Sequence, residues 1–119
     1  MGNSIAGEKS FCFAIRVVKL CRFLYNEKRE YVSSKQLLRC GTSIGANIHE
    51  ALQAQGKKDF LSKISIALKE ANESLYWIKL LHATEYLNDR QTDSIFTECD
   101  EIVKILVSIV KTTKQNLES

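Results

Sequence analysis

Apolar residues recur along most of this chain at steps of three and four, the spacing that places them on one face of an α-helix. Polar clusters separate the segments that show this pattern. The pattern predicts helices over residues 9–28, 34–54, 58–85 and 89–116. Proline is absent and only 5 glycines occur, so the chain lacks the turn residues that punctuate proteins built of short strands. The sequence therefore predicts an all-α protein.

Local signals indicate where some of these helices begin and end. Ser33 and Gln36 have the spacing of a capping box, in which each side chain bonds the other's backbone amide. Asn88 and Gln91 show the same spacing before the fourth segment. Gly56 favours a left-handed turn after the second segment. Each of these is an expectation about one helix end.

The connections between the predicted helices are short, which forces neighbouring helices to run antiparallel. With 119 residues and 13.5 kDa, the chain has the size of one domain. We therefore expect a single antiparallel, up-down-up-down four-helix bundle over residues 1–119.

Composition excludes several other classes of protein. Apolar residues make up 45% of the chain and charged residues 26%, which is close to the soluble average and unlike a disordered chain. A membrane span needs about 20 successive apolar residues, and Arg16, Lys19 and Arg22 interrupt the most apolar run. The four cysteines show neither C-x-x-C spacing nor histidine partners. We expect free thiols in a cytoplasmic protein without a membrane partner.

The positive charge is concentrated in the first third of the chain. Residues 9–39 hold eight Lys/Arg against two Glu, whereas the whole chain carries only +3. Such a basic surface can attract RNA or another polyanion, and a solvated lysine-rich surface is the plainer alternative. The candidate nucleic-acid-binding residues are Arg16, Lys19, Arg22, Lys35 and Arg39. Because few exposed aromatic residues are expected among them, we predict binding without base stacking.

Gly41 and Gly45 lie inside the second predicted helix, where each costs about 0.5–1 kcal/mol relative to alanine. Close packing against another helix would compensate for that cost. A phosphate-binding glycine loop is the alternative, but the P-loop lysine and the preceding strand are missing. Close helix packing is therefore the prediction.

Ser43, Asn47 and Glu50 follow one edge of the same helix and predict a polar seam at the boundary of the core. The alternative is a carboxylate metal site formed by Glu50, Glu70 and Glu73. Di-iron bundles use two Glu-x-x-His motifs, and this sequence has none. We expect a structural seam, with no metal and no cofactor.

Catalytic motifs are also missing from the sequence. There is no Gly-x-Ser-x-Gly motif, and the two histidines show no recognisable pairing with Cys40 or Cys99. The prediction is a protein that is not an enzyme.

Ile66, Trp77 and Leu80 gather on the side of the third helix opposite its core stripe. Tryptophan is enriched at the energetic centres of interfaces, so these residues predict a contact between copies of the chain. The alternative is that this long helix is central and its neighbours cover both of its sides.

Several runs of the chain resemble one bacterial family. They are SKQLLRCGTSIGANIHEA at residues 34–51, KDF at 58–60 and ALKEANESLYWIKLL at 67–81. The chain is similar over nearly its whole length to the 23S rRNA intervening-sequence proteins, although Cys40 stands where a serine is usual and His49 where a small residue is expected.

The resemblance implies a four-helix bundle that assembles into a cyclic homo-oligomer, a pentamer. It also implies a relation to the accessory protein of diversity-generating retroelements, which binds nucleic acid and a reverse transcriptase. No catalytic residue comes with the family.

Together these observations predict a non-enzymatic, oligomeric bundle that binds RNA weakly through its basic face. A protein-interaction scaffold, with no direct role for nucleic acid, is the alternative. The sequence identifies neither the partner nor the biological role.

Overall fold

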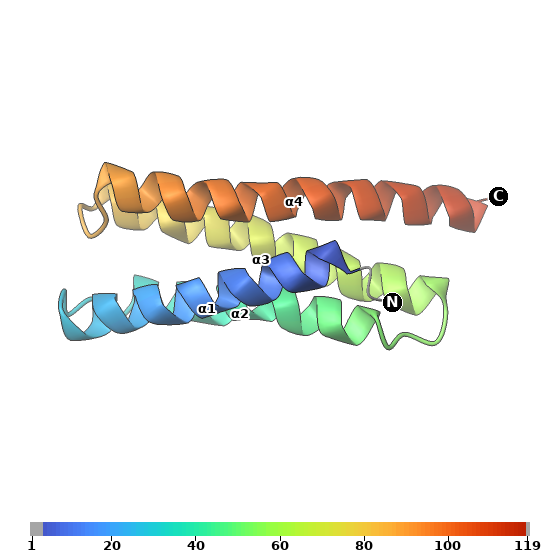
Figure 1. Cartoon of the computed structure of the whole chain (residues 1–119), viewed down its shortest axis with the longest axis horizontal. Coiled ribbons are helices and arrows are strands. Elements are labelled where there is room, and N and C mark those ends of the chain that lie inside the picture. The colour runs from blue at the N-terminus through green and yellow to red at the C-terminus, as the bar shows by residue number, and fades with distance from the viewer. Residues whose placement is uncertain (1–3, 119) are drawn as a thin grey trace.

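The computed structural model describes residues 4–118, which fold into four α-helices without a strand in that range (Figure 1). The helices are α1 (Ile5–Asn26), α2 (Ser33–Ala51), α3 (Lys57–Ala83) and α4 (Asp89–Glu118). The prediction of an all-α four-helix bundle is confirmed.

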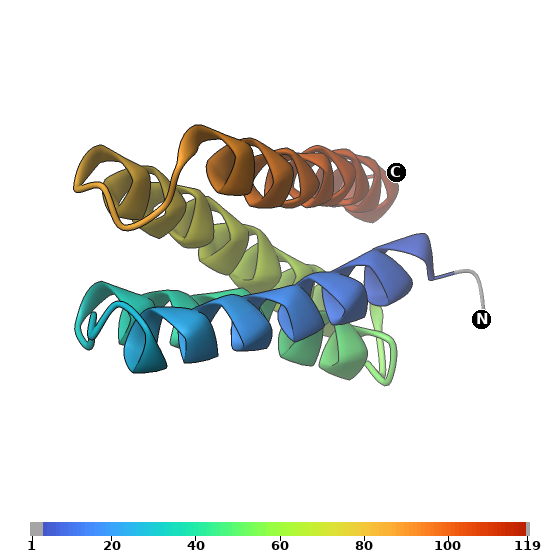
Figure 2. The same cartoon turned by 60° about the vertical axis from the view of Figure 1, so that its left-hand side comes forward.

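Helix α3 has the central position in the bundle. It packs against α2 on one side and α4 on the other, and Figure 2 shows it crossing between them. Helix α1 packs mainly on α2 and meets α4 along a shorter seam. The molecule is elongated, with principal extents of 50 × 22 × 20 Å.

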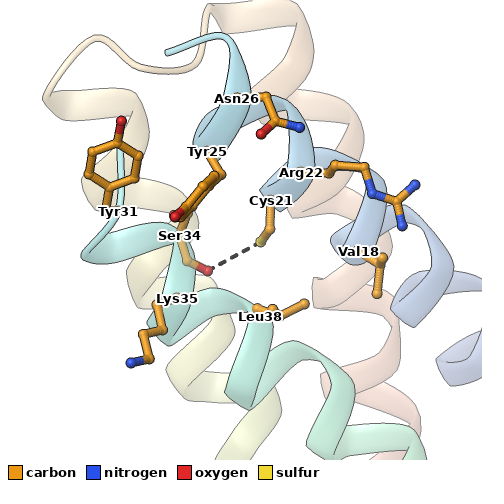
Figure 3. Close-up of a pocket in the computed structure, with 9 residues that line it drawn as sticks. All are labelled: Val18, Cys21, Arg22, Tyr25, Asn26, Tyr31, Ser34, Lys35 and Leu38. Carbon is orange, nitrogen blue, oxygen red and sulfur yellow. Dashed lines mark hydrogen bonds between the residues drawn. The ribbon is translucent and has the colours of Figure 1, made fainter. Parts of the chain in front are cut away.

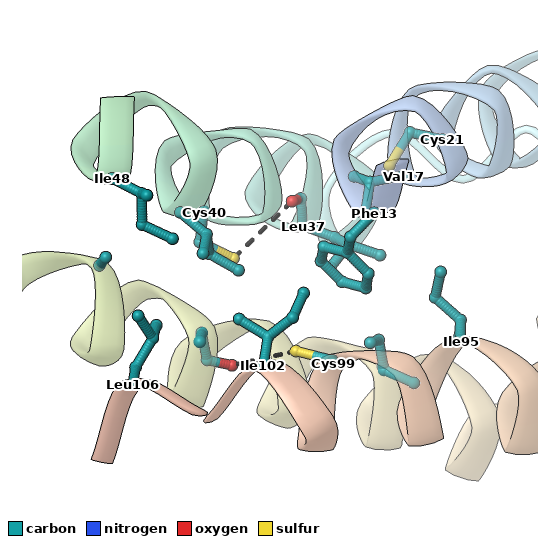
Figure 4. Packing of buried hydrophobic residues seen from close by; sticks show 14 of the residues in the cluster. Phe13, Val17, Cys21, Leu37, Cys40, Ile48, Ile95, Cys99, Ile102 and Leu106 are labelled. Carbon is teal, nitrogen blue, oxygen red and sulfur yellow. Dashed lines mark hydrogen bonds between the residues drawn. The ribbon is translucent and has the colours of Figure 1, made fainter. Parts of the chain in front are cut away.

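One hydrophobic core follows the long axis of the bundle (Figure 4). Burial of each large aliphatic or aromatic side chain contributes about 1.5–3 kcal/mol, so facing stripes from four helices stabilise what no single helix could. Three thiols lie within this core and pack as small apolar groups. Its largest fully buried side chains include Phe13, Leu24, Leu37, Ile44, Ile48, Ile64, Ile78, Leu81, Ile95, Ile102 and Leu106.

The helix ends differ from the sequence predictions by up to four residues. Helix α1 begins at Ile5, earlier than expected, because the Ser4 hydroxyl accepts a hydrogen bond from the Gly7 amide at 2.9 Å. Helix α2 ends at Ala51. The predicted left-handed turn at Gly56 is wrong, since Gly56 is extended (φ −161°) and immediately precedes α3.

The predicted capping box of Ser33 and Gln36 is also wrong. Helix α2 begins at Ser33, and the cap comes from Glu30 in the preceding connection. The Glu30 carboxylate accepts hydrogen bonds from the Ser33 amide at 3.0 Å and the Ser34 amide at 2.7 Å. The Ser34 hydroxyl in turn donates to the Glu30 carbonyl at 2.7 Å.

The second predicted capping box is confirmed. The Gln91 amide donates to Asn88 Oδ1 at 2.8 Å, and the Asn88 amide donates to Gln91 Oε1 at 2.9 Å. Helix α4 starts between them at Asp89, whose carboxylate lies at the positive end of the helix dipole.

Close packing of α1 on α2 occurs at the two glycines inside α2. A Cβ atom on Gly41 would lie 2.9 Å from Val17 Cγ1, closer than side chains pack. A Cβ on Gly45 would lie 3.4 Å from Ser10 Oγ. The missing side chain at Gly41 therefore lets the β-branched Val17 approach the α2 backbone. Both glycines lie mid-helix, where their amides take part in helical hydrogen bonding rather than in a phosphate-binding loop.

Candidate nucleic-acid interface

The five basic residues predicted to bind nucleic acid fall in different seams of the bundle. Arg39 of α2 faces α3, where its guanidinium pairs with Glu70 Oε1 at 3.3 Å and with the Glu73 carboxylate. Its charge is thus already balanced by two carboxylates. Arg39 fixes the α2–α3 seam and is a poor candidate for a phosphate ligand.

Arg16 occupies the seam between α1 and α4. Its guanidinium pairs with the Glu98 carboxylate and donates to Ser94 Oγ at 2.8 Å. Lys9 pairs with Glu101 at 3.5 Å in the same seam. These contacts connect two helices that otherwise touch little, so the charge of Arg16 has a structural partner.

Lys19, Arg22 and Lys35 form no ion pair with any residue between 4 and 118. Arg22 of α1 and Lys35 of α2 line one cavity between these two helices (Figure 3). Lys19 and Arg22 line an adjoining hollow further along α1. We call the cavity that Arg22 and Lys35 line between the two helices, together with the adjoining hollow of Lys19 on α1, the α1–α2 basic groove.

Two tyrosines lie in this groove, contrary to the expectation that few aromatic side chains accompany the charges. Tyr25 of α1 and Tyr31 of the connection have ring centroids 4.7 Å apart at an interplanar angle of 62°. They line a cavity of about 390 Å³ together with Arg22 and Lys35. Neither tyrosine was among the predicted site residues: Tyr31 stands outside any periodic segment, although both tyrosines are near the basic residues in the sequence.

The buried thiols of the core have no nucleophilic character. Burial raises the pKa of Cys21 and of Cys99 to about 12, and burial also raises the pKa of Cys40. Cys21 at the inner wall of the cavity donates its S–H to the Ser34 carbonyl at 3.3 Å. These groups remain neutral thiols at physiological pH, and a nucleophile needs the thiolate.

The predicted polar seam of Ser43, Asn47 and Glu50 is bonded differently from the expectation. The Ser43 hydroxyl donates to the Arg39 carbonyl at 2.7 Å, and Asn47 Nδ2 donates to the Ser43 carbonyl at 2.8 Å. Both bonds stay within α2. Only Glu50 reaches α3, where it lies 3.9 Å from Lys63 Nζ.

The candidate carboxylate site does not assemble. Glu50 pairs with Lys63, whereas Glu70 and Glu73 share Arg39. Within residues 4–118 no group of three or more His, Cys, Asp or Glu side chains is placed to hold a metal ion.

The apolar stripe predicted on the outer side of α3 is narrower in the structure. Ile66 is 40% exposed, but Trp77 and Leu80 are half-buried. Trp77 packs against the core, and its indole N–H donates to Glu73 Oε2 at 3.2 Å. Because α3 is central, its neighbours cover much of the surface that the sequence suggested was free.

A more exposed apolar surface lies at the other end of the α1–α2 pair. Phe11 is 67% exposed and lines a hollow of about 880 Å³ with Leu52. Phe11, Ile15 and Val18 follow at i, i+4 and i+7 and also line the hollow beside Lys19 and Arg22, so a second apolar stripe on α1 was the signal that could have found the exposed Phe11.

Comparisons with known proteins are consistent with this fold. The family model described as 23S rRNA-intervening sequence protein matches residues 3–108. A solved structure of a protein of unknown function from the S23 ribosomal protein family of Bacteroides thetaiotaomicron is 55% identical. The match covers 90% of this chain and 99% of that one, with a TM-score of 0.89. A search of curated proteins finds no match.

These matches give no support to the further relation with the retroelement accessory protein. Among the described residues, the helices are too short or too polar to cross a membrane.

Proposed function

Because the chain belongs to the 23S rRNA-intervening sequence protein family, we propose that it is a non-enzymatic bundle that binds RNA through the α1–α2 basic groove. One observation carries the proposal: Lys19, Arg22 and Lys35 line two adjoining hollows and have no carboxylate partner among the described residues, whereas Arg16 and Arg39 are paired. A cation without a carboxylate partner gives up no ion pair when it binds a phosphate. A paired cation must first break its ion pair with the carboxylate, which costs free energy.

The proposed binding is electrostatic and depends on salt. Single-stranded nucleic acid loses affinity with a logarithmic slope of about 0.7 per neutralised phosphate. Three phosphate contacts then give a loss of about 20-fold between 50 and 200 mM salt. We expect one chain to bind RNA with low affinity, so the dependence of that affinity on ionic strength is the property to measure.

Replacement of Lys19, Arg22 and Lys35 by glutamine tests the groove. The readout is fluorescence anisotropy of a labelled single-stranded RNA across a salt series. We expect the triple variant to lose most of its affinity at low salt together with its salt dependence.

A matched control distinguishes the groove from net charge. Lys104, Lys111 and Lys114 lie on the exposed side of α4, and their replacement by glutamine changes the net charge equally. We expect this control to retain the wild-type salt slope. If both triple variants lost the same affinity for RNA, binding would depend on net charge and not on the groove. If the wild type bound no RNA at low ionic strength, the proposed function would be wrong.

We further propose that the chain forms a homo-oligomer, a pentamer as the family resemblance implies. The exposed Phe11 and Ile66 support self-association, because large apolar side chains on a surface gain from being covered. A ring would repeat the basic groove and convert weak contacts into avidity. Light scattering tests the surfaces around Phe11 and Ile66 by comparing the mass of the wild type with the masses of Phe11→Glu and Ile66→Glu. A wild-type mass equal to that of one chain would exclude the ring.

A protein-interaction scaffold is the second candidate function, and the hollow beside Phe11 and Leu52 favours it. Its apolar lining suits the apolar face of a partner helix. In this case, a protein partner co-purifies after nuclease treatment, Phe11→Glu releases it, and the triple variant of the basic groove retains it.

We also propose a reducing compartment, the cytoplasm, as the place of this activity. Cys21, Cys40 and Cys99 are free and buried in the core, and the exposed Cys12 is free as well. Unpaired thiols are usual where glutathione keeps cysteines reduced.

A further inference from the structure

We propose that the cavity beside Tyr25 and Tyr31 receives an unpaired base, so that the groove selects single-stranded over duplex RNA. This inference rests on the proposed function and adds the class of nucleic acid. It departs from the sequence prediction of phosphate binding without stacking.

The aromatic pair provides the stacking surface. Tyr25 is 58% exposed and Tyr31 is 48% exposed, although large aromatic side chains usually bury more of their surface. Their edge-to-face arrangement, with centroids 4.7 Å apart, holds each ring against the other. Any of the bases can stack on such a ring, because every base has a π-face.

Positive charge flanks the tyrosines on both helices. Arg22 extends from α1 and Lys35 from α2, and both line the same cavity as the tyrosines (Figure 3). A strand whose base enters the cavity would place its phosphates near these two side chains. Aromatic surface combined with unpaired cations is the combination by which proteins bind single strands.

The remaining walls fit a planar heterocycle. Val18 and Leu38 supply apolar surface, and Cys21 is a neutral thiol already bonded to a backbone carbonyl. The Asn26 side chain at the rim offers both a donor and an acceptor to a base edge. The charged residues that line the cavity, Arg22 and Lys35, are both cations, so none of the lining residues is a carboxylate that would repel a phosphate.

The cavity is held in place by the cap of α2. Glu30 immediately precedes Tyr31, and its carboxylate binds the amides of Ser33 and Ser34. The Ser34 carbonyl in turn accepts a hydrogen bond from the thiol of Cys21 on α1. These bonds fix the connection between the two tyrosines, so the site needs little ordering before it binds.

A duplex presents its bases paired and stacked, so it cannot place one in the cavity without unstacking it. Phosphate contacts alone would accept a duplex as readily as a single strand. The preference for unpaired RNA therefore distinguishes this inference from charge attraction.

The experiment compares three probes at low salt: a single-stranded oligonucleotide, its abasic counterpart, and a duplex of half its length, so that all three carry the same number of phosphates. We expect the wild type to bind the single strand at least about ten-fold more tightly than the abasic oligomer. A 2-aminopurine base in the single strand should lose fluorescence on binding, because stacking on tyrosine quenches it.

The variants Tyr25→Leu and Tyr31→Leu remove the aromatic faces and keep apolar bulk. We expect them to bind the single strand only as well as the abasic oligomer, whereas Tyr25→Phe keeps the preference. Tyr76→Leu is the matched control, because Tyr76 of α3 is also 58% exposed and lies outside the groove. It should behave as the wild type.

Equal wild-type affinity for the single-stranded and abasic oligomers, with no change in 2-aminopurine fluorescence, would overturn the base site and leave electrostatic RNA binding intact. Failure of the proposed function is a different result, in which none of the three probes binds. A preference that survives in both leucine variants would also overturn the site.

Discussion

The two connections at one end of the bundle, residues 27–32 and 84–88, start their following helices in different ways. The first uses the carboxylate of Glu30, which is only 8% exposed and binds two amides of α2. The second uses the reciprocal capping box of Asn88 and Gln91, which is exposed to solvent. Both capping side chains precede their helix, but Glu30 is buried and Asn88 is exposed, so water can compete for the amides of the second cap more readily than for those of the first.

This difference matches what each connection carries. Tyr31 and Lys35 of the proposed RNA site lie directly beyond Glu30, so the buried cap sets their position relative to α1. The second connection is spanned by an exposed pair, His82 of α3 and Asp89 of α4, with Nε2 and Oδ1 2.7 Å apart. We infer that the first connection is the more rigid of the two.

Glu30→Ala is expected to have the largest effect on stability. It leaves the amides of Ser33 and Ser34 without their acceptor, and Ser34 is buried. The loss of a cap and an unsatisfied buried donor together cost about 2 kcal/mol. Urea unfolding of the wild type and of Glu30→Ala at pH 7 measures this difference in the free energy of unfolding. An unchanged midpoint would mean that water replaces the carboxylate without cost, and the first connection would not be the more tightly held.

The contribution of Glu30 should also depend on pH. Burial alone would raise the pKa of Glu30, but hydrogen bonds from Ser33 and Ser34 outweigh it and hold that pKa below the usual 4.5. A lowered pKa in the folded state gives stability that is present above pH 4.5 and lost as the pH falls through the folded value.

The gap in free energy of unfolding between the wild type and Glu30→Gln should therefore narrow as the pH falls below about 4.5. Unfolding curves at pH 7 and at pH 3 measure this gap. Asn88→Ala is the control, because Asn88 does not titrate and its gap to the wild type should stay nearly constant. A Glu30→Gln gap that widens in acid would contradict the assigned cap.

Asn88→Ala should cost less than Glu30→Ala, about 1 kcal/mol. It removes one acceptor from an exposed helix start, where water can satisfy the Gln91 amide. The same urea experiment gives the comparison. A loss equal to that of Glu30→Ala would show that burial does not distinguish the two caps.

Sequence predicted the exposed cap and missed the buried one for a physical reason. The Asn88–Gln91 box is a local motif with fixed spacing, whereas Glu30 acts from a connection that has no such signature. The four helices follow in the same way from apolar periodicity, which local spacing determines. Their ends shifted where a serine or a carboxylate outside the periodic segment supplied the cap.

The candidate site was less predictable, because charge pairing depends on the tertiary fold. The sequence marks five basic residues alike, and only packing separates Arg16 and Arg39, which face carboxylates, from Lys19, Arg22 and Lys35. Carboxylates 82 and 31 residues away in the chain make that distinction. In the same way, the central place of α3 decides how much of Trp77 is covered.

Glu85→Gly gives the smallest expected effect, a gain in stability. Glu85 follows the C-cap of α3 and is in the left-handed region (φ 70°), where its amide donates to the His82 carbonyl and the next amide donates to the Leu81 carbonyl. A non-glycine residue costs about 1 kcal/mol in that conformation, and glycine does not. Because glycine also loses more entropy on folding, the net gain should be about 0.5 kcal/mol in urea unfolding.

The matched control for this change lies at the corresponding helix end of the first connection. Glu27 is the C-cap of α1 and carries the same charge as Glu85, but its backbone is in the right-handed region (φ −94°). Glu27→Gly removes that charge without relieving any strain, so it should not stabilise the fold. A gain in both variants would trace the effect to the lost negative charge, and a gain in Glu85→Gly alone traces it to the backbone of the second connection. The second connection would then store strain at Glu85, and the left-handed Arg29 (φ 54°) marks the comparable position in the first connection.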